Sequence, residues 1–134
     1  MAIFLLAMGL EASRGSSCRM KPALQKKLFA DFPKLFAQKD EDMSVTCMCW
    51  GIECPDAWYD VIYTACALLQ TMTDNNTHSN KYPQVQFTQV KEKFGRLCMY
   101  NDTNTDYVNG VIDMADAMVQ QLDSKSGIDR IYKF

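Results

Sequence analysis

The stretch CMCWGIECPDAWYD, residues 47–60, holds three of the six cysteines and both tryptophans of the chain. Cysteine and tryptophan are residues that proteins bury to a large extent, so we expect this stretch to pack against the core. Pro55 favours an extended backbone before it, and Asp56 is a residue type that caps helix N-termini. The stretch, called here the cysteine–tryptophan motif, is therefore predicted to lead directly into a helix that begins at Asp56.

Size and charge limit the classes of protein to consider. The chain has 134 residues, 48% of them apolar and 22% charged, which is typical of a single globular domain. Its formal net charge of −2 argues against nucleic acid as a partner, because phosphate binding calls for an excess of basic residues. The apolar run from Ala2 to Leu10 is shorter than the roughly 20 residues that span a membrane, so no membrane association is expected. No basic residue precedes the run, which argues against a secretion signal. Met20-Lys21-Pro22 looks like a natural start, so we treat residues 1–19 as an N-terminal extension and residues 20–134 as the domain.

Hydrophobic periodicity predicts an α+β fold, with about three helices packed against an antiparallel β-hairpin or small sheet. Apolar residues at helical spacing predict helices over residues 22–31, 56–72 and 105–123. Alternating apolar and polar residues predict a hairpin over residues 85–100, with Gly95 in its turn.

The last predicted helix has the clearest division into an apolar and a polar face. Its expected core stripe is Val108, Val111, Ile112, Ala115, Met118, Val119 and Leu122. The opposite face is expected to be exposed to solvent and consists of Asn109, Asp113, Asp116 and Gln120.

Two motifs in combination resemble a known family. They are CMCWGIEC followed by WYD at residues 58–60, and QVKEKFG at residues 89–95 followed by Leu97 and Tyr100. Together they resemble motifs of small uncharacterised proteins encoded by tailed bacteriophages. The chain departs from these relatives at Gly95-Arg96, where they carry Gly-Gly, at Cys98-Met99, where they carry Arg-Phe, and in lacking a terminal Cys-x-x-Cys pair. The resemblance implies a protein that acts in the cytoplasm of the infected bacterial host, and it supplies no reaction.

The two motifs also carry the candidate binding site. If the hairpin packs across the start of the second helix, six residues are predicted to converge on one surface: Trp50, Glu53, Tyr59, Lys91, Lys93 and Arg96. There the aromatic rings can stack on a ligand, the basic residues can meet anionic groups, and Glu53 can accept hydrogen bonds. The structural alternative is that Glu53 pairs with Lys91 or Lys93 and that both tryptophans belong to the core.

Three functions remain open. We favour a non-catalytic phage accessory protein that binds or inhibits a host protein, or sequesters a small anionic signalling ligand, with an anti-defence role among the options. The first alternative is a small enzyme in which Glu53, Asp60 and the basic hairpin act on a phosphate-containing substrate. The second is a zinc-binding module that uses thiolates of Cys47, Cys49, Cys54 and Cys98. Because Cys-x-Cys-x4-Cys is not a standard zinc-knuckle spacing, we expect neither a metal nor a cofactor.

Overall fold

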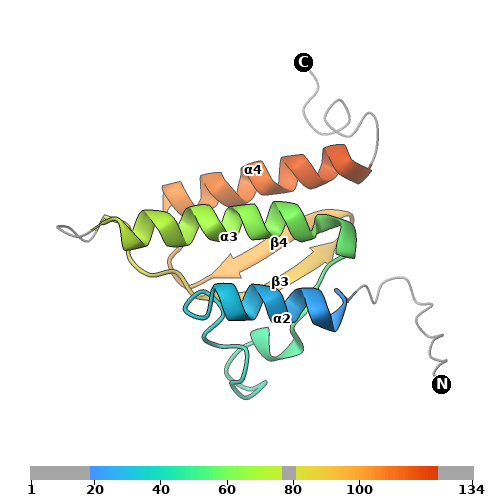
Figure 1. Ribbon diagram of the computed structural model, residues 1–134, viewed down its shortest axis with the longest axis horizontal. Helices are drawn as coiled ribbons and strands as arrows, with labels where there is room; N and C mark the ends of the chain where they lie inside the picture. The colour runs from blue at the N-terminus through green and yellow to red at the C-terminus, as the bar shows by residue number, and fades with distance from the viewer. Residues whose placement is uncertain (1–18, 77–80, 124–134) are drawn as a thin grey trace.

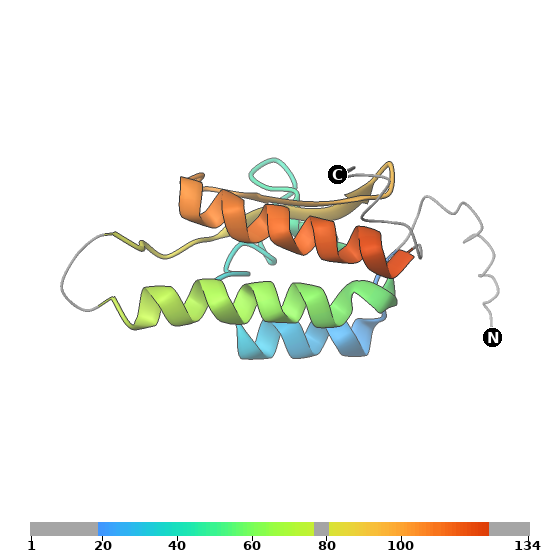
Figure 2. The ribbon, with the colours of Figure 1, turned by 90° about the horizontal axis from the view of Figure 1, so that it is seen from above.

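The computed structural model describes residues 19–76 and 81–123, which form the predicted α+β fold. Its helices are α2 (Pro22–Asp31), α3 (Tyr59–Asp74) and α4 (Asp106–Asp123). Its strands are β2 (Ile52–Glu53), β3 (Phe87–Lys93) and β4 (Arg96–Asn101), and the short 3-10 turns are η2 (Met48–Trp50) and η3 (Asp56–Trp58). Figures 1 and 2 show the three helices on one side of the sheet, with α3 between α2 and α4.

The predicted hairpin is confirmed as the antiparallel pair β3 and β4. Its turn residues Phe94 and Gly95 both have positive φ, 54° and 80°, as a two-residue type I′ turn requires. The motif contributes a third strand that we did not predict, because β2 pairs with β3 in parallel and places Ile52 opposite Val90. This pairing joins the cysteine–tryptophan motif to the hairpin in one sheet with the order β2-β3-β4.

Helix α3 provides much of the core. The apolar stripe that predicts this helix consists of Trp58, Val61, Ile62, Ala65, Leu69 and Met72, and all of these except Met72 are buried. The predicted N-cap at Asp56 is wrong, because no side chain caps this helix and the chain first forms the turn η3. The Asp56 carboxylate instead accepts a hydrogen bond from the Lys21 amide at 2.8 Å, where the first amides of α2 lack helical partners. Asp56 thus ties the beginning of α2 to the beginning of α3.

Helix α4 faces the sheet with a side that the sequence pattern had assigned to solvent. Asp116 and Gln120 are 5% and 2% exposed, so their predicted exposure is wrong. The Asp116 carboxylate accepts a hydrogen bond from the Leu97 amide at 2.9 Å, and Gln120 donates to the Gly95 carbonyl. Because these polar groups satisfy the hairpin backbone, α4 is rotated toward β4, and part of its predicted core stripe, including Met118, is left exposed.

The described chain begins just before α2. Met20 is buried, and its amide donates a hydrogen bond to the Ile52 carbonyl at 3.0 Å. The first residue of the predicted domain therefore packs into the fold. The rest of the predicted N-terminal extension, residues 1–18, lies outside the described residues. Within the described ranges, no helix has both the length and the apolar character needed to cross a membrane.

Candidate functional site

The site is built around a glycine in the cysteine–tryptophan motif. Gly51 has φ 78° and ψ −158°, a backbone region that is essentially reserved for glycine. A Cβ at this position would lie 2.5 Å from Oε1 of Gln25, a buried residue of α2. The same Oε1 accepts a hydrogen bond from the Ile52 amide at 2.9 Å, while Gln25 Nε2 donates to the Met20 carbonyl at 2.7 Å. Gln25 therefore connects α2 to Met20, which precedes the helix, and to Ile52 in β2.

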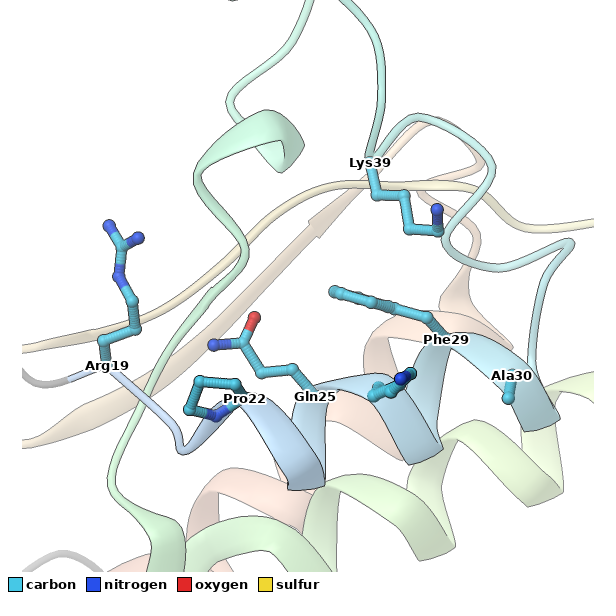
Figure 3. A pocket seen from close by; sticks show the side chains of 7 residues that line it. Arg19, Pro22, Gln25, Phe29, Ala30 and Lys39 are labelled. Atoms are coloured by element: carbon cyan, nitrogen blue, oxygen red, sulfur yellow. The ribbon is translucent and has the colours of Figure 1, made fainter.

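A cleft opens beside this junction, along the exposed side of α2. It has a volume of about 620 Å³. We call it the cationic cleft, and its lining residues are Arg19, Pro22, Gln25, Lys26, Phe29, Ala30 and Lys39. Figure 3 shows Phe29 projecting from α2 toward Lys39, Gln25 projecting toward the segment that carries Ile52, and Arg19 beyond the N-terminal end of the helix. A smaller hollow of about 320 Å³ shares four of these residues and extends the cleft to Trp50 and Gly51.

The charges in the cleft are predominantly positive. Arg19 forms a long ion pair with Glu53, 3.9 Å between the nearest N and O, and Lys39 pairs with Asp40 at 2.8 Å. Lys26 makes no ion pair with any described residue. Exposed ion pairs contribute about 1 kcal/mol or less, so an anionic ligand can displace these carboxylates at little cost.

The cleft also offers aromatic surface. Lys39 Nζ lies 5.7 Å from the centre of the Phe29 ring, and that ring packs edge-on against Phe36. Trp50 is 46% exposed, whereas Trp58 is buried at 1%. The structural alternative, in which both tryptophans belong to the core, is therefore wrong for Trp50 and correct for Trp58.

Several of the predicted site residues lie on the sheet. Glu53 on β2 is the register partner of Lys91 on β3, so the structure brings the two sequence motifs side by side at this point. Lys93 is at the end of β3, opposite Arg96 on β4. Arg96 is turned toward α4, where its Nε donates to Asp116 Oδ2 at 2.7 Å. Arg96 therefore holds the hairpin to the helix, which is a structural role that the sequence did not predict.

Tyr59, the remaining predicted residue, begins α3 and lies in an aromatic row with Tyr63, 5.8 Å between ring centres. The Tyr63 hydroxyl donates to Asp31 Oδ2 at 2.6 Å, and this bond raises the pKa of Tyr63. The pKa of Asp31 is lowered, mainly by the hydrogen bond from Lys27 and then by the one from Tyr63. These contacts tie α2 to α3 and fix the wall of the cleft that α2 forms.

The cysteines of the candidate metal site occupy different environments. Cys47 is exposed, Cys54 is buried, and Cys49 and Cys98 are partly buried. Among residues 19–76 and 81–123, no three His, Cys, Asp or Glu side chains form a group suited to a metal ion. The zinc-binding module remains an untested alternative. Burial raises the pKa of the Cys66 thiol in α3, which makes that group a poor nucleophile.

Sequence reasoning missed most residues of the cleft: Arg19, Gln25, Lys26, Phe29 and Lys39. Phe29, the one aromatic residue among them, is partly buried and packs against the core, so its apolar character does not mark it as a lining residue. The arrangement offers charge, an aromatic face and amide groups, which are the components of a binding site. Comparisons with protein-family models, with curated proteins and with solved structures found no match.

Proposed function

We propose that this protein is a non-catalytic binding protein that takes up a small anionic ligand in the cationic cleft. The observation that carries the proposal is that Arg19, Lys26 and Lys39 line one cleft together with the partly buried ring of Phe29, which Lys39 approaches to 5.7 Å. A volume of about 620 Å³ is within the range of small-molecule sites. Phosphate or carboxylate groups suit the three cations, and a planar ring suits Phe29 and Trp50. The favoured ligand class is therefore a nucleotide-like anion.

The biological setting is part of the same proposal. The resemblance of the two sequence motifs to tailed-bacteriophage proteins supports an accessory protein that acts in the cytoplasm of the infected host. Sequestering a small signalling molecule there suits an anti-defence role, and binding or inhibiting a host protein is the other form of the same function. The cysteine–tryptophan motif lines the smaller hollow that extends the cleft, which links the resemblance to the proposed site.

Binding is favoured over the enzyme alternative for a geometric reason. That alternative needs Glu53, Asp60 and the basic hairpin to act together on one substrate. Glu53 pairs with Arg19, and Arg96 of the hairpin is engaged by Asp116. The Arg19–Glu53 pair is long and exposed, but Asp116 is buried, so Arg96 is committed to a structural role and is not available to a substrate.

Tryptophan fluorescence tests the proposal. Ligand in the cleft should change the emission of the exposed Trp50, whereas the buried Trp58 gives a constant background. The panel consists of inorganic phosphate, linear and cyclic mononucleotides and dinucleotides, with calorimetry to confirm each hit. Lys26→Ala and Lys39→Ala should each weaken binding about tenfold, because hydrogen bonds to charged groups contribute roughly 1.5–3 kcal/mol.

The matched control is Lys34→Ala, which removes an exposed lysine that does not line the cleft. It should leave affinity unchanged. Phe29→Leu keeps apolar volume but removes the ring, and it should weaken nucleotides more than inorganic phosphate. If no member of the panel binds more tightly than about 1 mM, or if the two cleft variants bind as well as the control, the proposal is wrong.

A further inference from the structure

A second surface lies between α3 and α4, on the face of α4 turned away from the sheet. Successive helical residues are about 100° apart, so Met114 points roughly opposite to Asp116, which contacts β4. The two helices leave a groove of about 380 Å³ between them. We call it the helix groove, and its apolar lining includes Val61, Leu68, Tyr107, Val111, Met114 and Met118.

The apolar side chains of this surface are unusually open to solvent. Met114 is 65% exposed, Leu68 is 47% exposed and Met118 is 44% exposed. Leu122, one turn beyond Met118, is 58% exposed and extends the patch along α4. Contiguous exposed apolar patches of this kind mark interaction sites in soluble proteins. The methionines suit a helical partner, because their flexible side chains adapt to the surface that they meet.

Charge identifies the kind of partner. Helices α3 and α4 together contain six aspartates and neither lysine nor arginine. The complete chain, in contrast, has 14 basic and 16 acidic residues, so the rest of it is net positive. Asp106 lines the helix groove, and Asp60 and Asp113 are exposed. Of the five aspartates whose side chains the structure describes, Asp116 alone forms an ion pair with another described residue.

We propose that the helix groove binds a cationic amphipathic helix of a protein partner. Two neighbouring helices with an apolar groove between them accept a third helix through its apolar stripe, and the aspartates meet basic residues that flank the stripe. A second copy of this chain would bring the same aspartates face to face, and this like-charge contact opposes self-association. The surface is separate from the cationic cleft and carries charge of the opposite sign.

A designed peptide tests the proposal on the full chain. The probe has about 18 residues, long enough to form a helix, with leucine and lysine at helical spacing and a fluorescent label. One control peptide has the same composition in strict alternation, and another has glutamate in place of lysine. Fluorescence anisotropy should show that the helical cationic peptide binds, that both controls bind at least about tenfold more weakly, and that salt weakens its binding.

Matched variants locate the site. Replacing Met114 and Met118 together by serine should weaken the peptide about tenfold or more. Asp113→Lys should weaken binding of the peptide and make that binding less dependent on salt. The controls are Phe94→Ser, which removes an apolar residue that is 92% exposed at the hairpin turn, and Glu41→Lys, which reverses an exposed charge before the motif. Both controls should bind normally, and near-ultraviolet circular dichroism should show that all variants remain folded.

Three results would overturn the proposal. The first is equal binding of the glutamate peptide or of the groove variants. The second is a dimer in light scattering that dissociates when Met114 and Met118 are replaced, which would assign the groove to a second copy. The third is nuclear Overhauser contacts between these two methionine methyl groups and residues 124–134 in the free full-length chain, which would assign it to the chain itself.

Discussion

Replacing Asp116 by alanine should destabilise the protein more than any other change to an acidic side chain of α4. The Asp116 side chain is 8% exposed, and its carboxylate accepts hydrogen bonds from the Leu97 amide at 2.9 Å and from the Arg96 guanidinium. An unpaired buried amide costs about 1–3 kcal/mol. Arg96 is 47% exposed and can return to water, so its share is about 1 kcal/mol or less. The free energy of unfolding should therefore fall by about 1–4 kcal/mol.

Urea denaturation followed by tryptophan fluorescence measures this change. Asp116→Asn retains one oxygen for the Leu97 amide but places an N–H beside Arg96, so its effect should be intermediate. Asp113→Ala removes an exposed aspartate from the same helix, and surface changes of this kind usually stay within about 0.5 kcal/mol. If Asp116→Ala matches Asp113→Ala within that range, α4 is not held to the hairpin as described.

Three further outcomes are expected. Gly51→Ala should lower the free energy of unfolding by about 1–3 kcal/mol. Gly95→Ala should lower it less, because a Cβ at Gly95 meets nothing within 4 Å. Equal effects of the two substitutions in urea denaturation would contradict this. In the native protein, mass spectrometry after iodoacetamide treatment should find Cys47 modified rapidly and Cys66 protected, because burial raises the pKa of the Cys66 thiol; comparable rates would refute the assigned environments. Since the folded-state pKa of Asp31 is lowered, its stabilisation is present above about pH 4 and is lost as the pH falls through the folded value. Asp31→Asn should therefore lose stability less steeply on acidification than the wild type, and parallel pH profiles would exclude this linkage.

The parts of the fold that depend on local patterns could be predicted from the sequence. The stripe that includes Val61, Ile62 and Leu69 predicts α3 because each residue lies on the same face at the helical period. The hairpin follows from alternation and from Gly95 in its turn. The parallel strand β2 could not be predicted, because its two residues carry no periodicity and its partner Val90 lies far along the chain. Its existence depends on tertiary packing.

Of the candidate site, too, the residues in the motif could be predicted, whereas those that tertiary packing brings together could not. Trp50 and Glu53 were recognisable because the motif concentrates tryptophan, cysteine and acid in a few residues. Arg19 and Lys39 reach the cleft from segments on either side of α2, and nothing in their own neighbourhoods indicates that they meet. The cleft forms where Gln25 joins α2 to Met20 and to the motif. From the sequence alone, a glutamine in a helix is expected on the surface, so this junction could not be predicted.

A net charge of −2 conceals how the charges are distributed. The cationic cleft lies along α2, and the acidic helix groove lies between α3 and α4, with α3 separating α2 from α4 (Figure 1). The bond between Tyr63 and Asp31 holds α2 to α3, while Val61 belongs both to the core and to the lining of the groove. If both proposals hold, an anionic ligand and a cationic helix would occupy separate surfaces of opposite charge. Because α3 lies between α2 and α4 and packs against the core, its packed side chains are the route by which the two sites could be coupled.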